Sequence, residues 1–298
     1  MEPIKRGFEM KTDRLLKTIA VVCGIFCMGV LPVHAKDKMI QIKGSDTIVN
    51  LSQAWAEAFM TENPQASLAV TGGGSGTGIA ALINGTTDIA NASRKIKKKE
   101  IEDAQKSGYY PEEFKVAVDA LAVIVNPANP VKELTIDQLS DIFTGKITNW
   151  NEVGGKDQKI LVLSRERNSG THMYFLENVL RKGNEKGPEQ FAPSVLMLPS
   201  SEAIINETST SESAIGYDGL GYVTPKVKTI AVAKKKGDAF VPPSKETAMN
   251  KTYPIWRFLY MYTGFKPRGE IKAFIDFALS EKGQKIVEEM GFVPLREK

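Results

Sequence analysis

Residues 67–83 read SLAVTGGGSGTGIAALI, and this stretch decides the fold class because it places a strand, a turn and a helix in immediate succession. Residues 67–70 are typical of a strand, residues 71–78 are glycine, serine and threonine, and residues 79–83 continue as an apolar helical run. The same order recurs over residues 39–60 and 160–180. Strands that alternate with helices in this way predict an α/β protein.

Further strands and helices are expected along the rest of the chain. The apolar run Val116–Val125 is typical of a strand that is buried on both faces of a parallel sheet. Residues 271–278 and 283–290 are expected to close the chain as helices. A length of 298 residues suits two medium-sized domains better than one core, and we expect the crossovers near Val118–Ala122 and Ile215–Val223.

Three turns of one design carry the chemistry of the chain. They are Lys43–Thr47, Thr71–Gly78 and Arg165–Thr171, and each lies between an expected strand and an expected helix. A helix N-terminus has unpaired N–H groups and a partial positive charge, so it attracts anions, while glycine permits close approach and hydroxyl groups add donors. Serine and threonine are also common caps, so one such turn alone would be structural. Three of them predict a site for a small oxyanion.

Four charged features lie beside these turns. Arg165 follows an expected strand and can form two parallel hydrogen bonds to an oxyanion, whereas Arg94 is either a second ligand or a surface arginine. The run Lys95–Glu100 is expected to be a solvated helix face. Asp46 is either a helix cap or an acceptor for the proton of phosphate, a proton that fully ionised sulfate does not have.

Composition argues against several other functions. The formal net charge is only +4, charges of both signs are mixed, and no basic stripe is interleaved with aromatics, so nucleic-acid binding is not expected. No Lys-Ser/Thr pair follows Gly78, as a nucleotide-binding P-loop would require. After residue 35 the chain has no cysteine and one histidine, His172, which argues against thiol catalysis, metal sites and cofactors.

Residues 1–35 are predicted to be a signal peptide. Five lysines and arginines between Lys5 and Lys17 precede an apolar run, Ile19–Val33, and the segment ends in Val33-His34-Ala35, a pattern that signal peptidase accepts. The run is short for a membrane span, although a membrane anchor is the alternative. We therefore expect secretion into the periplasm.

The turns and their neighbours resemble the Pst-type phosphate-binding proteins of bacterial ABC importers over essentially the whole chain after residue 35. The matching segments are Gly44–Thr47, Gly73–Gly78, Asp88–Arg94, Asp141–Trp150 and Arg165–Thr171. The resemblance implies a type II periplasmic-binding fold, in which two α/β lobes are joined by a two-strand hinge. On this basis residues 36–118 and 218–298 are expected to form lobe 1, and residues 119–217 lobe 2.

The same resemblance implies a function: the chain would bind inorganic phosphate and deliver it to a membrane permease, as a monomer without enzymatic activity. By position it places ten residues near phosphate, namely Ser45, Thr47, Ser75, Gly76, Thr77, Ser93, Arg165, Ser169, Gly170 and Thr171. Better-known members of the family have an aspartate where Arg94 stands. We therefore expect Asp46 to accept the proton of the ligand in its place.

Three alternatives remain open from the sequence. The first is an exported phosphatase-like enzyme on the same fold, which would need a nucleophile with a base, or metals, that the sequence does not offer convincingly. The second is a binder of another tetrahedral oxyanion, such as sulfate or molybdate. The third is a surface adhesion protein.

Overall fold

The structure is a computed structural model that describes residues 39–295. The predicted signal peptide and its cleavage site lie outside these residues. The strands are β1 (Ile40–Gly44), β2 (Leu68–Thr71), β3 (Ile89–Ala92), β4 (Glu112–Val125), β5 (Glu133–Thr135), β6 (Leu161–Arg165), β7 (Leu196–Leu198), β8 (Ala214–Gly219), β9 (Lys228–Thr229), β10 (Ala231–Ala233) and β11 (Trp256–Thr263). The α-helices are α2 (Val49–Glu62), α3 (Ser75–Ile83), α4 (Lys98–Lys106), α5 (Ile136–Phe143), α6 (Gly170–Phe175), α7 (Ser201–Thr210), α8 (Lys245–Met249), α9 (Gly269–Leu279) and α10 (Glu281–Glu289). Four short helical turns complete the list: η1 (Asp46–Ile48), η2 (Trp150–Val153), η3 (Leu176–Leu180) and η4 (Leu220–Tyr222).

One sheet of nine strands runs through this part of the chain in the order β2-β1-β3-β11-β4-β8-β6-β7, with β9 beside β4. Strands β1, β2 and β3 are parallel to one another, and so are β6, β7 and β8. Between these two parallel groups, β11 and β4 run antiparallel to their neighbours. The predicted α/β class is confirmed.

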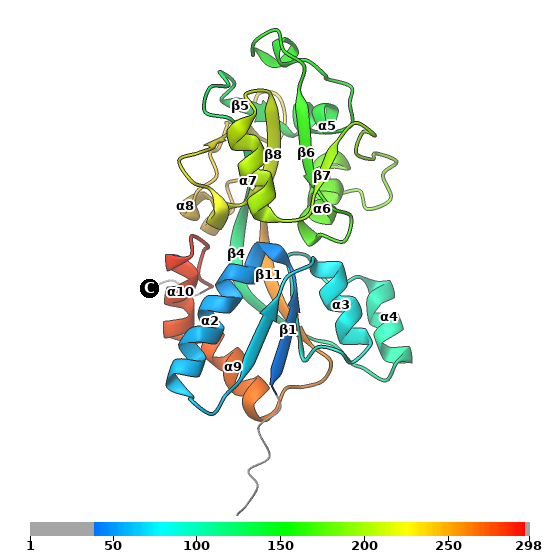
Figure 1. Ribbon diagram of the computed structural model, residues 1–298. Helices are drawn as coiled ribbons and strands as arrows, with labels where there is room; N and C mark the ends of the chain where they lie inside the picture. Colours follow the sequence, from blue (N-terminus) through cyan, green and yellow to red (C-terminus); the bar gives the residue numbers. More distant parts are fainter. Residues whose placement is uncertain (1–38, 296–298) are drawn as a thin grey trace, which may run out of the picture. The chain divides into compact units, whose positions relative to one another are not determined.

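Strand β4 passes from one hydrophobic core to another. Its first part pairs with β11 as far as Ala120, and its second part pairs with β8 from Leu121 onward. Val116 and Ala117 pack in one core, whereas Val123 and Val125 pack in the other. Figure 1 shows β4 and β11 side by side where they connect the two groups of helices and strands.

The apolar run Val116–Val125 is buried as expected, but its pairing differs from the expectation. β4 is antiparallel to β11, β8 and β9, whereas the run was expected in a parallel sheet. An uninterrupted apolar run indicates that both faces of a strand are covered, and this is equally true at the centre of a mixed sheet. The direction of the neighbouring strands therefore could not be derived from the run.

Most helices lie where the sequence predicted them. α2 buries Leu51, Trp55 and Phe59 on one face, and α9 and α10 pack beside it (Figure 1). The helix expected over residues 172–180 starts as α6 and continues as one π-helical stretch, η3. Within residues 39–295, no helix is both long and apolar enough to cross a membrane.

Candidate anion-binding site

The predicted turns lie at the carboxyl edges of the two parallel groups of strands. Ser45–Thr47 follows β1, the glycines before α3 follow β2, and Ser93 follows β3. In the other group, the turn before α6 follows β6. The carboxyl ends of parallel strands share one edge of a sheet, where α/β proteins bind their ligands. The turns of each group are therefore brought together by strand direction alone.

Four buried hydroxyl groups from four segments meet at this place, and we call Thr47, Ser75, Ser93 and Thr171 the hydroxyl cluster. Thr47 Oγ1 lies 2.7 Å from Thr171 Oγ1, and Ser93 Oγ lies 3.4 Å from Thr171 Oγ1 and 3.3 Å from Ser75 Oγ. None of the four side chains is more than 1% exposed. Thr171 comes from the second parallel group and the other three from the first, so the cluster joins the two.

Two helices begin at the hydroxyl cluster. α3 begins at Ser75 itself, after Gly74, and α6 begins at Gly170, after Ser169. The side chain of Ser169 accepts hydrogen bonds from two backbone N–H groups of α6, while no side chain caps α3. The backbone N–H of Gly76 donates to Asn168 O at 2.9 Å, so the two helix starts are in direct contact. The N-termini of both helices, each of which carries a partial positive charge, therefore lie next to each other.

Gly170 is required at this contact. A Cβ atom on Gly170 would lie 2.2 Å from Ser75 Oγ and 2.7 Å from Ser93 Oγ, far inside ordinary van der Waals distance. A larger residue here would move α6 away from the cluster or turn the Ser75 and Ser93 hydroxyl groups out of it. The glycine in the third turn thus serves close approach, as the sequence pattern indicated.

Arg165 lies beside the hydroxyl cluster and is only 1% exposed. Its Nη2 donates to Asp46 Oδ2 at 2.7 Å and to Pro199 O at 2.8 Å, and its Nη1 donates to Ser201 Oγ at 3.0 Å. A second carboxylate, Asp218, lies 3.7 Å away. The guanidinium group is thus held in a fixed orientation from several sides.

Asp46 has both carboxylate oxygens engaged. Oδ2 accepts from Arg165, and Oδ1 accepts from the backbone N–H of Gly73 at 2.8 Å. The backbone oxygen of Asp46 also accepts from the Tyr222 hydroxyl group at 2.7 Å. Asp46 therefore ties the turn after β1 to the glycine turn and to β6, and its side chain is 12% exposed.

Sequence reasoning missed three charged residues that are buried beside the same site. Arg257 donates to Asp119 Oδ2 from both Nη2, at 2.9 Å, and Nε, at 3.0 Å, and also donates to the backbone oxygen of Ser93. Asp218 accepts from Ser201 and from the backbone N–H of Gly219. Each of these charges interrupts an apolar strand, and that interruption is the signal that could have identified it.

Burial dominates the ionisation of the two missed aspartates. It raises the pKa of Asp119 to about 6, although the Arg257 guanidinium beside it acts in the opposite direction. Burial likewise raises the pKa of Asp218, against the attraction of Arg165. A Cβ atom added to Gly219 would lie 2.9 Å from Thr47 Cγ2 and 3.1 Å from both carboxylate oxygens of Asp119. Asp119 therefore lies close to Thr47, with Gly219 between them.

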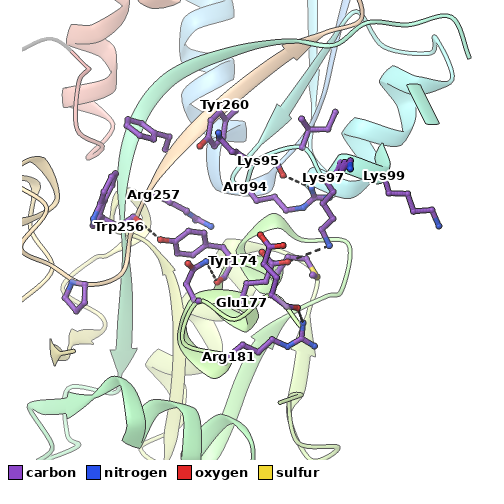
Figure 2. A pocket seen from close by; sticks show the side chains of 18 residues that line it. Arg94, Lys95, Lys97, Lys99, Tyr174, Glu177, Arg181, Trp256, Arg257 and Tyr260 are labelled. Carbon is purple, nitrogen blue, oxygen red and sulfur yellow. Dashed lines mark hydrogen bonds and ion pairs between the residues drawn. The ribbon is translucent and has the colours of Figure 1, made fainter. Parts of the chain in front are cut away.

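The structure does not bring Arg94 to the hydroxyl cluster. Its guanidinium group forms two hydrogen bonds with Glu100, at 2.6 and 2.8 Å, and one with Lys95 O. Figure 2 shows Arg94 in a neighbouring groove instead. Of the remaining predicted residues, Ser45 is buried directly before Asp46, and Thr77 lies in the first turn of α3 near Asn168. Among residues 39–295, no group of three or more His, Cys, Asp or Glu side chains could hold a metal ion.

Comparison with known proteins identifies the family. The family model described as the PBP superfamily domain matches residues 32–282. A phosphate-binding protein PstS from Pseudomonas aeruginosa is 38% identical over 269 residues, which are 85% of this chain and 81% of the relative. The chain belongs to the Pst-type family of phosphate-binding proteins.

Further members of the family agree with this assignment. PstS from Bacillus subtilis is 36% identical over 258 residues, covering 86% of this chain and 80% of its own. A Clostridium perfringens structure, described as a phosphate ABC-transporter substrate-binding protein with bound phosphate, is 35% identical. It superposes with a TM-score of 0.77 and covers 87% of this chain and 100% of its own. The family and the type II periplasmic-binding fold expected from the sequence are confirmed.

Proposed function

We propose that this chain binds inorganic phosphate at the hydroxyl cluster and delivers it to the permease of an ABC importer. One observation carries the proposal: four buried hydroxyl groups and two helix N-termini lie together, and Asp46, next to Thr47 in the chain, holds the guanidinium of Arg165 beside them. The Pseudomonas and Bacillus relatives are named phosphate-binding proteins, and the Clostridium relative was solved with phosphate. These names describe binding and transport, not catalysis.

The chemistry of the site suits a tetrahedral oxyanion. Hydroxyl and backbone N–H donors can surround the oxygens, and hydrogen bonds to a charged group contribute about 1.5–3 kcal/mol each. A micromolar dissociation constant requires about 8 kcal/mol, and an association cost of about 4 kcal/mol raises the requirement to about 12 kcal/mol. About four to eight such bonds supply that free energy. Among the predicted ligands we retain Ser45, Gly76, Thr77, Ser169 and Gly170 as proposed contributors beside the cluster.

We further propose that the site lies between two lobes that close around the ion. The core packing favours lobe limits that differ from those expected from the sequence. Most buried apolar residues between Ala120 and Ile255 form two hydrophobic cores, one of which also includes Val293. Those up to Ala117 and from Leu259 onward form two others. We therefore propose the boundaries 119/120 and 255/256 in place of 118/119 and 217/218. β4 and β11 would then be the hinge strands, and the 2.7 Å contact between Thr47 Oγ1 and Thr171 Oγ1 would belong to the closed arrangement.

The residue that accepts the phosphate proton is proposed to be Asp46 or Asp119. Asp46 is the acceptor expected from the sequence, and Asp119 is a candidate because it lies close to Thr47 in the structure. Calorimetric titration of Asp46→Asn and Asp119→Asn with phosphate and with sulfate separates the two. The acceptor is the residue whose replacement abolishes the preference for phosphate over sulfate. If both variants keep that preference, neither carboxylate has the role.

The proposed location is the periplasm, reached through the N-terminal signal peptide. N-terminal sequencing of the protein isolated from the producing cell tests this proposal. A mature chain that begins at Lys36 is expected, whereas an intact residue 1–35 segment would contradict it.

A titration of the mature protein against phosphate, sulfate and arsenate tests the main proposal. Phosphate and arsenate are expected to bind with similar enthalpy, since both are tetrahedral and carry a proton at neutral pH, and sulfate is expected to bind far more weakly. Sulfate binding equal to phosphate binding would favour the alternative oxyanion function. Phosphate release from a chromogenic ester by metal-free protein would favour the phosphatase alternative.

A further inference from the structure

A groove that the phosphate site does not use lies beside it. It has a volume of about 990 Å³, at the upper end of the range for small-molecule sites, and far exceeds the needs of a single phosphate ion. Three segments form its walls: residues 94–99 before and at the start of α4, residues 173–185 from α6 onward, and residues 254–260 of β11 and the turn before it (Figure 2). No member of the hydroxyl cluster lines the groove, so it is a separate site.

The groove is strongly positive. Seven cationic side chains line it, and two lining glutamates, Glu177 and Glu185, oppose them. Two further carboxylates outside the lining, Glu100 and Asp119, pair with Arg94 and Arg257, so three positive charges remain in excess. Within residues 39–295, the lysines at 95, 98 and 99 form no ion pair.

The cations are also exposed to solvent or incompletely bonded. Lys95, Lys98 and Lys99 are exposed, and Lys97 is 43% exposed with its Nζ 3.9 Å from Glu177 Oε1. Arg94 is 93% buried, yet its Nε has no hydrogen-bond partner among the described atoms. Arg181 donates only to backbone oxygens. This arrangement offers several donors to an anion without breaking a strong ion pair.

The opposite wall of the groove is aromatic. Trp256, Phe258 and Tyr260 alternate along β11 and therefore line the groove from the same side of the sheet. Tyr174 of α6 lies beside Trp256, and its hydroxyl group donates to the backbone oxygen of Trp256 (Figure 2). Trp256 and Phe258 are only half-buried. Lys251 Nζ lies over the Trp256 ring at 5.1 Å and Lys115 Nζ over the Phe258 ring at 4.4 Å, and the two rings are inclined at 83° to each other. A flat ring can therefore stack on the uncovered face of one of them.

We propose that this groove binds a nucleoside monophosphate, with its base stacked on Trp256 and its phosphate among Lys95, Lys98 and Lys99. A cationic rim facing an aromatic wall matches a ligand that carries a phosphate at one end and a planar ring at the other. An inorganic anion would use only the rim, and an uncharged aromatic compound would use only the wall. The combination therefore selects a phosphorylated ring compound.

Tryptophan fluorescence during titration with AMP tests the proposal, with saturating inorganic phosphate present to occupy the hydroxyl cluster. Trp55 and Trp150 are at most 1% exposed, so quenching by a ligand in the groove reports on Trp256. Saturable quenching is expected in the native protein and is expected to disappear in Trp256→Phe. Adenosine and ribose 5-phosphate, which each lack one half of the ligand, are expected to bind more weakly than AMP.

Calorimetry on charge-reversal variants supplies the matched control. Lys98→Glu with Lys99→Glu is expected to weaken AMP binding about tenfold or more, since each exposed charge contributes up to about 1 kcal/mol. Lys235→Glu with Lys236→Glu makes the same charge change on a distant exposed loop and is expected to leave AMP binding unchanged. Both double variants are expected to bind inorganic phosphate normally. Loss of AMP binding when phosphate saturates the protein, or equal AMP affinity in both double variants, would overturn the proposal.

Discussion

Replacement of Gly170 by alanine tests the phosphate site at its closest contact. The new Cβ would lie 2.2 Å from Ser75 Oγ, whereas ordinary contacts begin at 3.4 Å, so these atoms must separate by about 1.2 Å. Gly170 is the first residue of α6 and does not adopt a left-handed backbone conformation. Alanine therefore adds no backbone strain, and it is the better helix former. The perturbation acts on the contact and leaves the helix intact.

The size of the effect follows from the neighbouring residue. Thr171 is carried with Gly170, so its 2.7 Å separation from Thr47 Oγ1 would grow to about 3.9 Å if the shift lies along that line. Two donors of the cluster would then no longer converge on one ion. The loss of two charge-assisted hydrogen bonds corresponds to about 3–6 kcal/mol, and thus to at least about a hundredfold weaker binding.

Calorimetric titration with phosphate measures this loss, and thermal unfolding checks that the variant is folded. Gly76→Ala is the matched control, because Gly76 lies in the first turn of α3 and its Cβ would come no closer than 3.2 Å to Asn168 O. A shift of a few tenths of an ångström relieves that contact, so a loss of less than about tenfold is expected. Native phosphate affinity in Gly170→Ala, or an equal loss in both variants, would refute the reasoning.

Three further substitutions give separate expectations. Arg165→Ala leaves Asp218 buried without its cation, so it is expected to cost about 3–5 kcal/mol of unfolding free energy in denaturant titrations and to abolish phosphate binding; native affinity would remove Arg165 from the site. Thr47→Val keeps the side-chain shape but removes one donor, and is expected to weaken phosphate about tenfold by calorimetry. Burial lowers the pKa of His172 from 6.5 to about 4, so the unfolded chain binds the extra proton as pH falls through this window. The unfolding free energy should therefore drop by about 3 kcal/mol between these limits, and His172→Phe should flatten that drop; an unchanged pH profile would contradict it.

Much of the fold could be predicted because its signals are local. The segment at residues 67–83 folds as β2, a glycine turn and α3, since period, propensity and turn chemistry agree within one short window. The direction of β4 could not be predicted in the same way. Its partners β8 and β11 come about a hundred residues or more later in the chain, and an apolar strand packs equally well in a parallel or an antiparallel position.

In the candidate site too, residues in local sequence patterns could be predicted, whereas residues that depend on distant partners could not. Thr47, Ser75 and Thr171 were identified because each stands in a turn with a recognisable pattern, and the structure places their hydroxyl groups together. Asp119 and Arg257 were missed because each, taken alone, is a single charge in an apolar strand. Their pairing depends on strand register, which brings together residues 138 positions apart.

Turns that are distant in the sequence lie together because strand direction determines the edge of the sheet at which each turn stands. Each parallel group presents the ends of its strands, and the helix starts that follow them, at a single edge. Two such groups joined through β4 and β11 can meet edge to edge, and then helix N-termini of both groups point at one volume. Protein acceptors already take part of these helix starts, since Gly76 N–H donates to Asn168 O and the N–H groups of Thr171 and His172 donate to Ser169 Oγ. The topology therefore brings the donors of both groups to one place, and this is why we propose a single small anion as their shared ligand.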